Sequence, residues 1–172
     1  AAAAGSSLAL PRWSHAEPGS LDDCPASALN APVLVVTQAV SRDVNPRAAA
    51  WGYIAEVLRR AGLFFEELPP EHLPWLLRRP NAIVLLAGDL PLTAAQRGVL
   101  ATWVNDGGAL VGIGGTSGLD EVFGVTDARR LAEGWIKVTA QDHPLTAGLR
   151  SSLHVFGGYT VKPISATSLA GL

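Results

Sequence analysis

The stretch that decides the fold runs from Trp103 to Glu121 and reads WVNDGGALVGIGGTSGLDE. Its first part has helical spacing of apolar residues and ends at Gly107, which is typical of a helix C-terminus. The apolar run Ala109–Ile113 then predicts a short strand that leads into a glycine-rich turn, Gly114–Gly118. In an open α/β sheet, ligands usually bind at the carboxyl ends of the strands. We therefore expect this turn to lie at the functional edge of a sheet.

The residues upstream of this stretch alternate between strand and helix patterns. β-branched and apolar runs predict strands at residues 32–37, 63–68 and 83–87, as expected where a sheet is buried on both faces. Helices are expected from Asn45-Pro46 to Gly62, as one short helix among the four prolines of residues 69–80, and over residues 94–106 with Thr93 as the N-cap. A strand–helix–strand order favours parallel pairing through a right-handed crossover. We predict a mostly parallel sheet with the strand order 2-1-3-4.

The downstream residues predict smaller elements. A short helix is expected over residues 119–123, with Gly124 as its cap, and Trp135–Val138 alternates like a half-buried strand. Residues 153–161 indicate a bent strand or a hairpin around Gly157-Gly158, and residues 165–172 a turn and the start of a further strand. Residues 1–31 are rich in Ala, Ser, Pro and Gly and are interpreted as a flexible arm or linker. The domain is assigned to residues 32–172, and we expect the natural polypeptide to continue beyond Leu172.

Composition limits the classes of function. The chain has 172 residues, of which 48% are hydrophobic, and a formal net charge of −2, so it can bury a core but has no electrostatic footprint for nucleic acid. Its one cysteine, Cys24, excludes an intrachain disulfide and a cysteine-rich zinc site. No apolar run approaches the roughly 20 residues of a membrane helix. We expect no membrane segment in this chain; its location stays open, with the cytoplasm favoured.

Two segments resemble a known superfamily. Residues 103–111 are similar to the helix, Gly-Gly and strand segment of class I glutamine amidotransferase-like domains, especially the ThuA-like group and the domain that helps bacterial β-galactosidases trimerise. Asp142–Leu149, which reads DHPLTAGL, resembles a His-Pro-(Ile/Leu)-Thr-x-Gly-Leu segment of the ThuA-like group. The resemblance covers roughly residues 32–169. It implies a three-layer, flavodoxin-like α/β domain with helices on both faces of the sheet.

The resemblance also implies where a nucleophile would stand. Active amidotransferases carry a cysteine in a sharp Gly-x-Cys-x-Gly elbow after the strand that corresponds to Ala109–Ile113, and a downstream His and Glu complete the triad. Here the turn reads Gly112-Ile113-Gly114-Gly115-Thr116-Ser117-Gly118 and holds no cysteine. Glutaminase activity is therefore not expected, and an enzyme is the less favoured class.

The glycine-rich turn admits several interpretations. Its glycines permit a tight strand-to-helix turn, and Thr116 or Ser117 can cap the following helix. Alternatively, Gly114, Gly115 and the two hydroxyl residues bind an anion or another ligand through backbone N–H groups. Serine catalysis by Ser117 requires a base such as His143 or His154 within hydrogen-bond reach.

Acidic residues surround the same predicted edge. Asp89, Asp120 and Glu121 could meet across the crevice, either as a solvated rim or as ligands of a metal, and Gln38 follows the first strand. Asp142-His143-Pro144 is interpreted as a turn, with a tuned histidine base as the alternative. No cofactor is expected, and the four histidines show no metal-ligand spacing.

These observations lead to two functional hypotheses. The first is a catalytically inactive amidotransferase-like domain that serves ligand binding or protein assembly, with a carbohydrate connection that comes from the resemblance alone. Its partners would be a small molecule, a second copy or other domains. The second is a hydrolase that uses Ser117 and His143, or a carboxylate-bound metal. A further alternative is a purely structural domain whose exposed apolar surface, including Trp13 and Trp135, docks onto another subunit.

Overall fold

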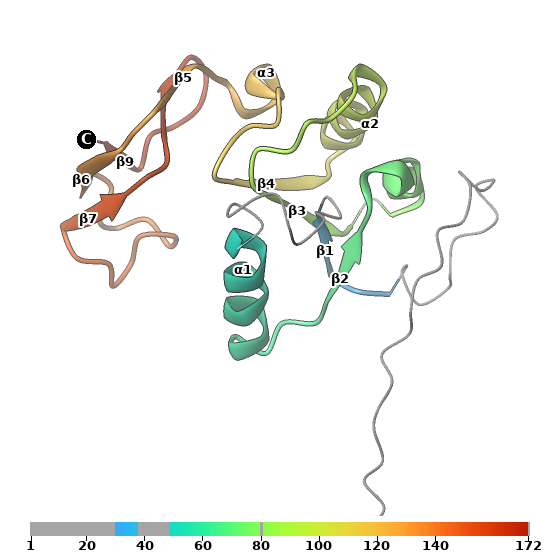
Figure 1. The fold of residues 1–172 in the computed structure, drawn as a ribbon, viewed down its shortest axis with the longest axis horizontal. Helices are drawn as coiled ribbons and strands as arrows, with labels where there is room; N and C mark the ends of the chain where they lie inside the picture. Colours follow the sequence, from blue (N-terminus) through green and yellow to red (C-terminus); the bar gives the residue numbers. More distant parts are fainter. Residues whose placement is uncertain (1–29, 38–48, 80, 172) are drawn as a thin grey trace, which may run out of the picture.

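The computed structural model describes residues 30–37, 49–79 and 81–171 (Figure 1). Most of the predicted arm, the helix start at Asn45-Pro46 and the candidate residue Gln38 lie outside the described residues. Within them, strands and helices alternate up to residue 123, and strands follow one another after it.

A four-stranded parallel sheet forms the first half of the described chain. Its strands are β1 (Val33–Val36), β2 (Phe65–Leu68), β3 (Ile83–Ala87) and β4 (Ala109–Ile113). They pair in the order β2-β1-β3-β4, all parallel, so the predicted order is confirmed. The carboxyl ends of β3 and β4 therefore lie side by side, and the turns that follow them meet at one edge of the sheet.

Three helices connect these strands, and a fourth follows β4. They are α1 (Ala49–Arg60), the 3-10 helix η3 (Pro70–Arg78), α2 (Ala94–Asn105) and α3 (Asp120–Phe123). Thr93 caps α2 as predicted: its hydroxyl accepts from Gln96 N at 3.2 Å, and the Gln96 side chain accepts from Thr93 N at 2.8 Å. The proline-flanked helix winds as a 3-10 helix with Pro74 inside it. None of the described helices is long and apolar enough to cross a membrane.

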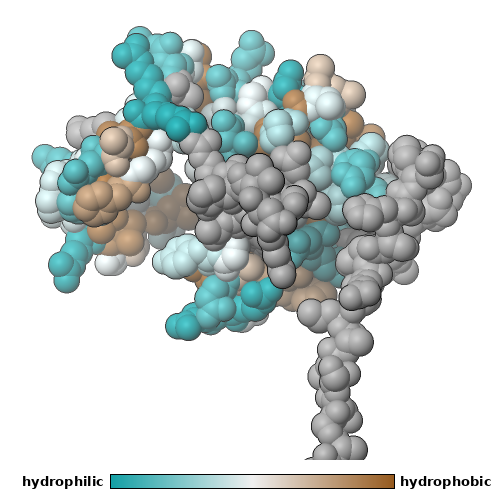
Figure 2. Space-filling view, in the orientation of Figure 1, coloured by the Kyte–Doolittle hydropathy of each residue, from teal (hydrophilic) through white to brown (hydrophobic). Residues whose placement is uncertain are grey.

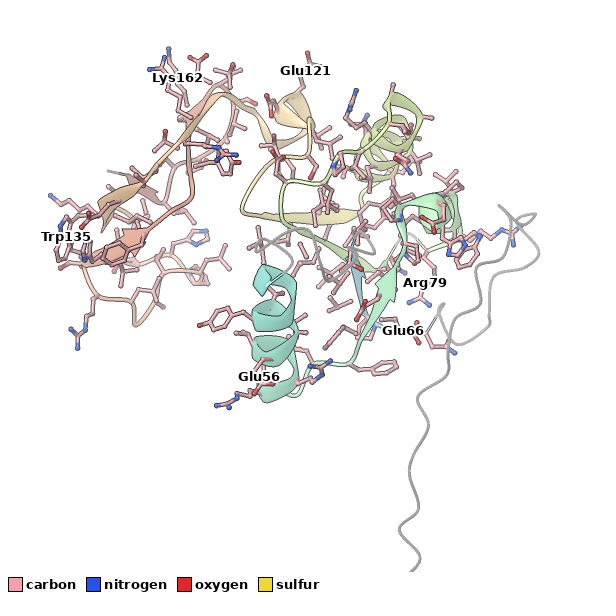
Figure 3. The ribbon with its side chains drawn as sticks, in the orientation of Figure 1. Glu56, Glu66, Arg79, Glu121, Trp135 and Lys162 are labelled. Atoms are coloured by element: carbon pink, nitrogen blue, oxygen red, sulfur yellow. The ribbon has the colours of Figure 1, made fainter. Side chains whose placement is uncertain are left out.

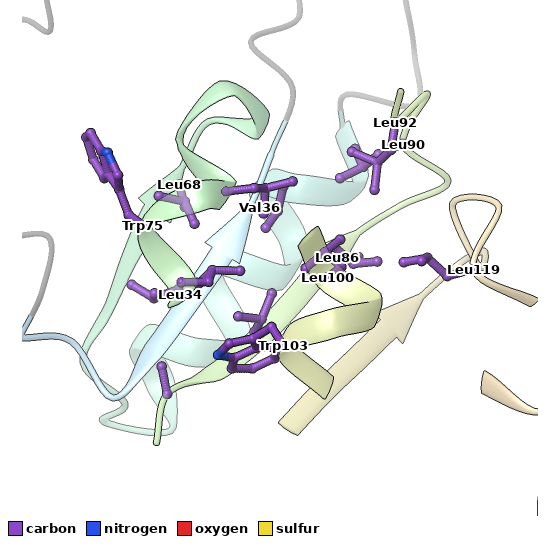
Figure 4. Packing of buried hydrophobic residues seen from close by; sticks show 14 of the residues in the cluster. Leu34, Val36, Leu68, Trp75, Leu86, Leu90, Leu92, Leu100, Trp103 and Leu119 are labelled. Carbon is purple, nitrogen blue, oxygen red and sulfur yellow. The ribbon is translucent and has the colours of Figure 1, made fainter. Parts of the chain in front are cut away.

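The two faces of the parallel sheet are covered by different helices. On one face, η3 and α2 pack on alternate strand residues such as Leu34, Val36 and Leu86 to form the larger core (Figure 4). On the other face, Leu58 and Ile54 of α1 pack on Val33, Val35 and Leu85. The helix α1 and the pair η3 and α2 thus lie on opposite faces of the parallel sheet.

Trp103 anchors the larger core. It is 2% exposed, and its indole Nε1 donates to the carbonyl of Arg79 at 3.2 Å. A Cβ at Gly108 would lie only 2.4 Å from the Trp103 ring, so the second glycine of the Gly-Gly pair lets the chain pass the ring and enter β4.

The chain after Gly124 leaves the parallel sheet. It forms β5 (Val125–Arg130), β6 (Glu133–Val138), β7 (Ser152–Phe156), β8 (Tyr159–Pro163) and β9 (Ala170–Gly171). These strands make a two-stranded antiparallel sheet, β5-β8, and a three-stranded antiparallel sheet, β7-β6-β9. Figure 1 shows them as a lobe beside α3. The prediction of a mostly parallel fold therefore holds for β1–β4 and is wrong for this lobe.

A candidate ligand cleft at the carboxyl edge of the sheet

A cleft of about 290 Å³ opens where the carboxyl ends of β3 and β4 face the β5-β8 sheet. The turn after β4 lies on one side, and residues of α3, β5 and β8 form the other side. The lining residues are Asp89, Gly112, Gly114, Gly115, Thr116, Phe123, Val125, Tyr159 and Val161. The cleft thus lies at the edge where the sequence predicted a site, and four of the eight predicted residues line it: Asp89, Gly114, Gly115 and Thr116.

The glycines of the turn permit close approach of the backbone. Gly114 has φ +79°, a conformation that favours glycine. A Cβ at Gly115 would lie 2.5 Å from Cβ of Asp89, and one at Gly112 would lie 2.9 Å from the Gly115 carbonyl oxygen. The two turns are also joined through the backbone, since Gly88 N donates to the Ile113 carbonyl at 2.8 Å. A side chain at Gly115 would separate the two turns that form the cleft floor, and one at Gly112 would displace the Gly115 carbonyl within the turn after β4.

Ser117 faces the protein interior. It is 3% exposed, and its φ of +54° is unusual for a residue with a side chain. Its hydroxyl accepts from Leu90 N at 2.9 Å and donates to the Gly88 carbonyl at 3.4 Å. Both hydroxyl partners are backbone groups of the β3–α2 connection, so the side chain fastens one turn to the other and does not line the cleft.

The predicted helix cap at Thr116 or Ser117 is wrong. The residue before α3 is Leu119, and no side chain caps the N-terminus of this helix. Instead, the Thr116 hydroxyl donates to the Asp120 carboxylate, and the backbone of Leu119 donates to the Thr116 carbonyl at 3.0 Å. The hydroxyl finds a carboxylate acceptor one turn ahead, and the carbonyl closes the turn.

The acidic residues do not converge. Asp120 is the acceptor of the Thr116 hydroxyl, and Glu121 is exposed and points outward from α3 (Figure 3). Among the described residues, no group of three histidine, cysteine, aspartate or glutamate side chains could hold a metal ion. Within the described part of the chain, Asp89 is the one charged residue that lines the cleft, and its Oδ1 accepts from Ser117 N at 3.0 Å.

Five lining residues were not among the predicted site residues: Gly112 and four from α3, β5 and β8. Phe123, Val125, Tyr159 and Val161 form the apolar side of the cleft. The pairing of β5 with β8 places Val125 opposite Pro163 and Arg130 opposite Tyr159, and β5 follows directly on α3, so a distant strand is brought to this side of the cleft. The alternation of Tyr159 and Val161 was a signal for one strand face, but the sequence does not show which partner that face meets.

The two histidines considered as bases for Ser117 lie in other parts of this fold. His143 belongs to a turn in which Thr146 N and Ala147 N both donate to its carbonyl at 2.9 Å, so the turn interpretation of residues 142–148 is confirmed. His154 lies on β7, with Nε2 at 2.8 Å from Glu133 Oε1. Neither imidazole is a partner of the Ser117 hydroxyl.

The chemistry of the cleft follows from its lining. The lining combines three residues with polar side chains, Asp89, Thr116 and Tyr159, with glycines and with the apolar residues Phe123, Val125 and Val161. Convergent polar groups orient a ligand while apolar and aromatic surface supplies contact area. Among the described lining residues, Asp89 carries the charge, and a carboxylate favours a neutral or cationic molecule over an anion.

The comparisons with known proteins concern the fold. No family model and no curated protein matches the sequence. Among solved structures, the chain is similar to a protein described as ThuA-like from Bacteroides uniformis, with a TM-score of 0.55 and 12% identity over 78% of this chain and 61% of that one. It is also similar to a cytoplasmic protein, STM3548, from Salmonella typhimurium, with a TM-score of 0.50 and 14% identity over 76% of this chain and 80% of that one. The chain thus shares the fold of a ThuA-like protein and spans about three fifths of that protein's length.

Proposed function

We propose that this chain is a flavodoxin-like, class I glutamine amidotransferase-like domain of the ThuA-like group that binds a small polar molecule without catalysing its conversion. The observation that carries the proposal is the cleft at the carboxyl edge of the parallel sheet, where a glycine-rich turn faces an apolar wall. Ligands bind at this edge in open α/β sheets. The similarity to a ThuA-like structure supports the fold part of the proposal.

The lining favours a hydroxylated ring as the ligand class. The carboxylate of Asp89 accepts hydrogen bonds from hydroxyl groups. The Tyr159 hydroxyl adds a donor and an acceptor, and the Thr116 hydroxyl, whose proton goes to Asp120, adds an acceptor. The Phe123 ring and the valines Val125 and Val161 offer apolar contact for the carbon face of such a ring. A saccharide combines both kinds of surface, and a volume of about 290 Å³ suits one or two sugar rings in size.

The lack of catalysis rests on the turn. Residues 112–118 contain no cysteine, and the hydroxyl of Ser117 is engaged by Leu90 N and the Gly88 carbonyl. A serine nucleophile needs a base within hydrogen-bond reach, which is itself oriented by a third group. The hydrolase that uses Ser117 and His143 is therefore the weaker hypothesis, and the acidic rim gives a carboxylate-bound metal no support within the described residues.

The two tyrosines of the chain provide a matched test. Tyr159 lines the cleft, and Tyr53 is 74% exposed on α1. Isothermal titration calorimetry with glucose, trehalose, lactose and L-glutamine should detect binding of at least one compound to the wild-type chain. Tyr159→Ala should weaken that binding about tenfold or more, and Tyr53→Ala should leave it unchanged. Equal loss in both variants, or release of ammonia from glutamine, would contradict the proposal.

A further inference from the structure

An exposed aromatic row crosses the outer face of the β7-β6-β9 sheet. Side chains alternate across a sheet, so Glu133, Trp135 and Lys137 of β6 share this face, and each is exposed. The register pairs these three residues with Phe156, His154 and Ser152 of β7. Trp135 is 61% exposed and Phe156 is 74% exposed. Figure 2 shows hydrophobic side chains gathered over this lobe, and Figure 3 shows Trp135 on it.

The row is ordered by contacts within the chain. The rings of Trp135 and His154 stack with centroids 4.4 Å apart and an interplanar angle of 9°. The His154 and Phe156 rings meet at 4.4 Å with an angle of 56°, and His154 Nε2 lies 2.8 Å from Glu133 Oε1. Side chains held in place before contact lose less entropy when a partner covers them. This face is therefore prepared for binding, although no residue of β6 or β7 lines the cleft.

The charges on this face identify its partner. Along β6, the acidic Glu133 and the basic Lys137 lie at equal distances on either side of Trp135. A two-fold axis in the plane of the interface, perpendicular to β6 and passing at Trp135, would place Glu133 of one copy over Lys137 of the other, twice. The same operation would place Trp135 over Trp135 and Phe156 over Ser152. Isologous interfaces of this kind are self-complementary by symmetry.

From this arrangement we propose that the outer face of β6 and β7, centred on Trp135, binds a second copy of this chain with the β6 strands antiparallel. Sheets that pack face to face lie about 10 Å apart with nearly aligned strands, which leaves room for the aromatic side chains between them. The proposal is independent of the cleft, and it extends the assembly hypothesis to named residues. The face is only two to three strands wide, so we expect weak association, with a dissociation constant of about 10–100 µM.

Charge reversal tests this geometry. Glu133→Lys makes the face wholly basic and Lys137→Glu makes it wholly acidic, so each single variant should remain monomeric at concentrations where the wild type self-associates. An equimolar mixture of the two variants restores both Glu–Lys contacts and should associate about as well as the wild type. The double variant E133K/K137E should also self-associate, because each reversed charge again meets its opposite.

Sedimentation velocity between about 5 and 200 µM measures these equilibria. The wild type should show a concentration-dependent dimer, which Trp135→Ala weakens at least tenfold and the matched control Tyr53→Ala leaves unchanged.

Far-UV circular dichroism confirms that each variant is folded. If a variant fails to fold, the proposal is tested on the wild type and the remaining variants. A wild type that stays monomeric at 200 µM, a Trp135→Ala variant that dimerises as tightly as the wild type, or a mixture of folded single variants that associates no better than each alone would overturn the proposal. Variants of Glu133, Trp135 and Lys137 should change dimerisation and leave ligand binding at the cleft unchanged, so failure of one proposal can be distinguished from failure of the other.

Discussion

The Asp89 carboxylate accepts a hydrogen bond from the backbone N–H of Ser117 at 3.0 Å, across 28 residues of sequence. This bond joins the turn after β3 to the turn after β4. A second hydrogen bond joins the same two turns, because the Ser117 hydroxyl accepts from Leu90 N at 2.9 Å. The carboxyl ends of two neighbouring strands are thereby fixed to each other, and the cleft has a defined floor.

The close approach of Gly115 to Asp89 predicts that position 115 has no room for a side chain. Gly115→Ala places a Cβ 2.5 Å from Asp89 Cβ, so the turns must separate. We expect a loss of about 1–3 kcal/mol in the free energy of unfolding, measured by urea denaturation, together with weaker ligand binding. Gly98→Ala is the control, because Gly98 lies inside α2 with open space around it. That variant should gain up to about 1 kcal/mol, and a stable Gly115→Ala would contradict the assigned role.

The buried hydroxyl of Ser117 predicts a structural effect. Ser117→Ala leaves Leu90 N without its side-chain acceptor, and we expect a loss of about 1–3 kcal/mol in the free energy of unfolding. Ser151→Ala, at an exposed position, should change stability by less than about 0.5 kcal/mol. Chemical denaturation of both variants measures the difference. A Ser117→Ala variant as stable as the wild type would show that the hydroxyl does not hold the two turns together.

Glu66 predicts a pH dependence of stability. Burial raises the pKa of this carboxyl above its ordinary value, and the Arg79 guanidinium partly opposes the shift; both residues are labelled in Figure 3. Its Oε2 is shielded from solvent and has no hydrogen-bond partner among the residues that the structure describes. Because the folded chain holds this proton more tightly than the unfolded chain, the stability contributed by Glu66 is lost as pH rises through the raised pKa.

Glu66→Gln should therefore raise the melting temperature at pH 7, and the gain should shrink as pH falls toward 4. Thermal unfolding at several pH values measures this difference between the variant and the wild type. Glu67→Gln, on the exposed neighbour in β2, should show a smaller and less pH-dependent effect. The prediction is contradicted if Glu66→Gln lowers the melting temperature at pH 7 more than it does at pH 4. That result would mean that the fold stabilises the charged carboxylate.

The parallel sheet could be predicted because its signals are local. The strand runs, the Thr93 cap and the Gly107-Gly108 helix end each determine nearby backbone, and strand–helix alternation determines parallel pairing. The site was only half predictable. Asp89 and Gly114–Thr116 follow strand ends, so topology alone brings them together. Tyr159 and Val161 reach the cleft through the long-range pairing of β5 with β8. Ser117 points inward with a φ of +54°, and the sequence pattern did not predict this backbone conformation.

The most direct test of the proposed function is a map of where a ligand binds. A ¹⁵N-labelled chain is titrated with trehalose, glucose, lactose and L-glutamine while the backbone amide resonances are followed by NMR. With at least one of these compounds, we predict chemical-shift changes concentrated at Gly114, Gly115 and Thr116, with no change at residues 142–149. Shifts confined to residues outside the cleft, or no shift at any of its amides with all four compounds, would contradict ligand binding at this edge of the sheet.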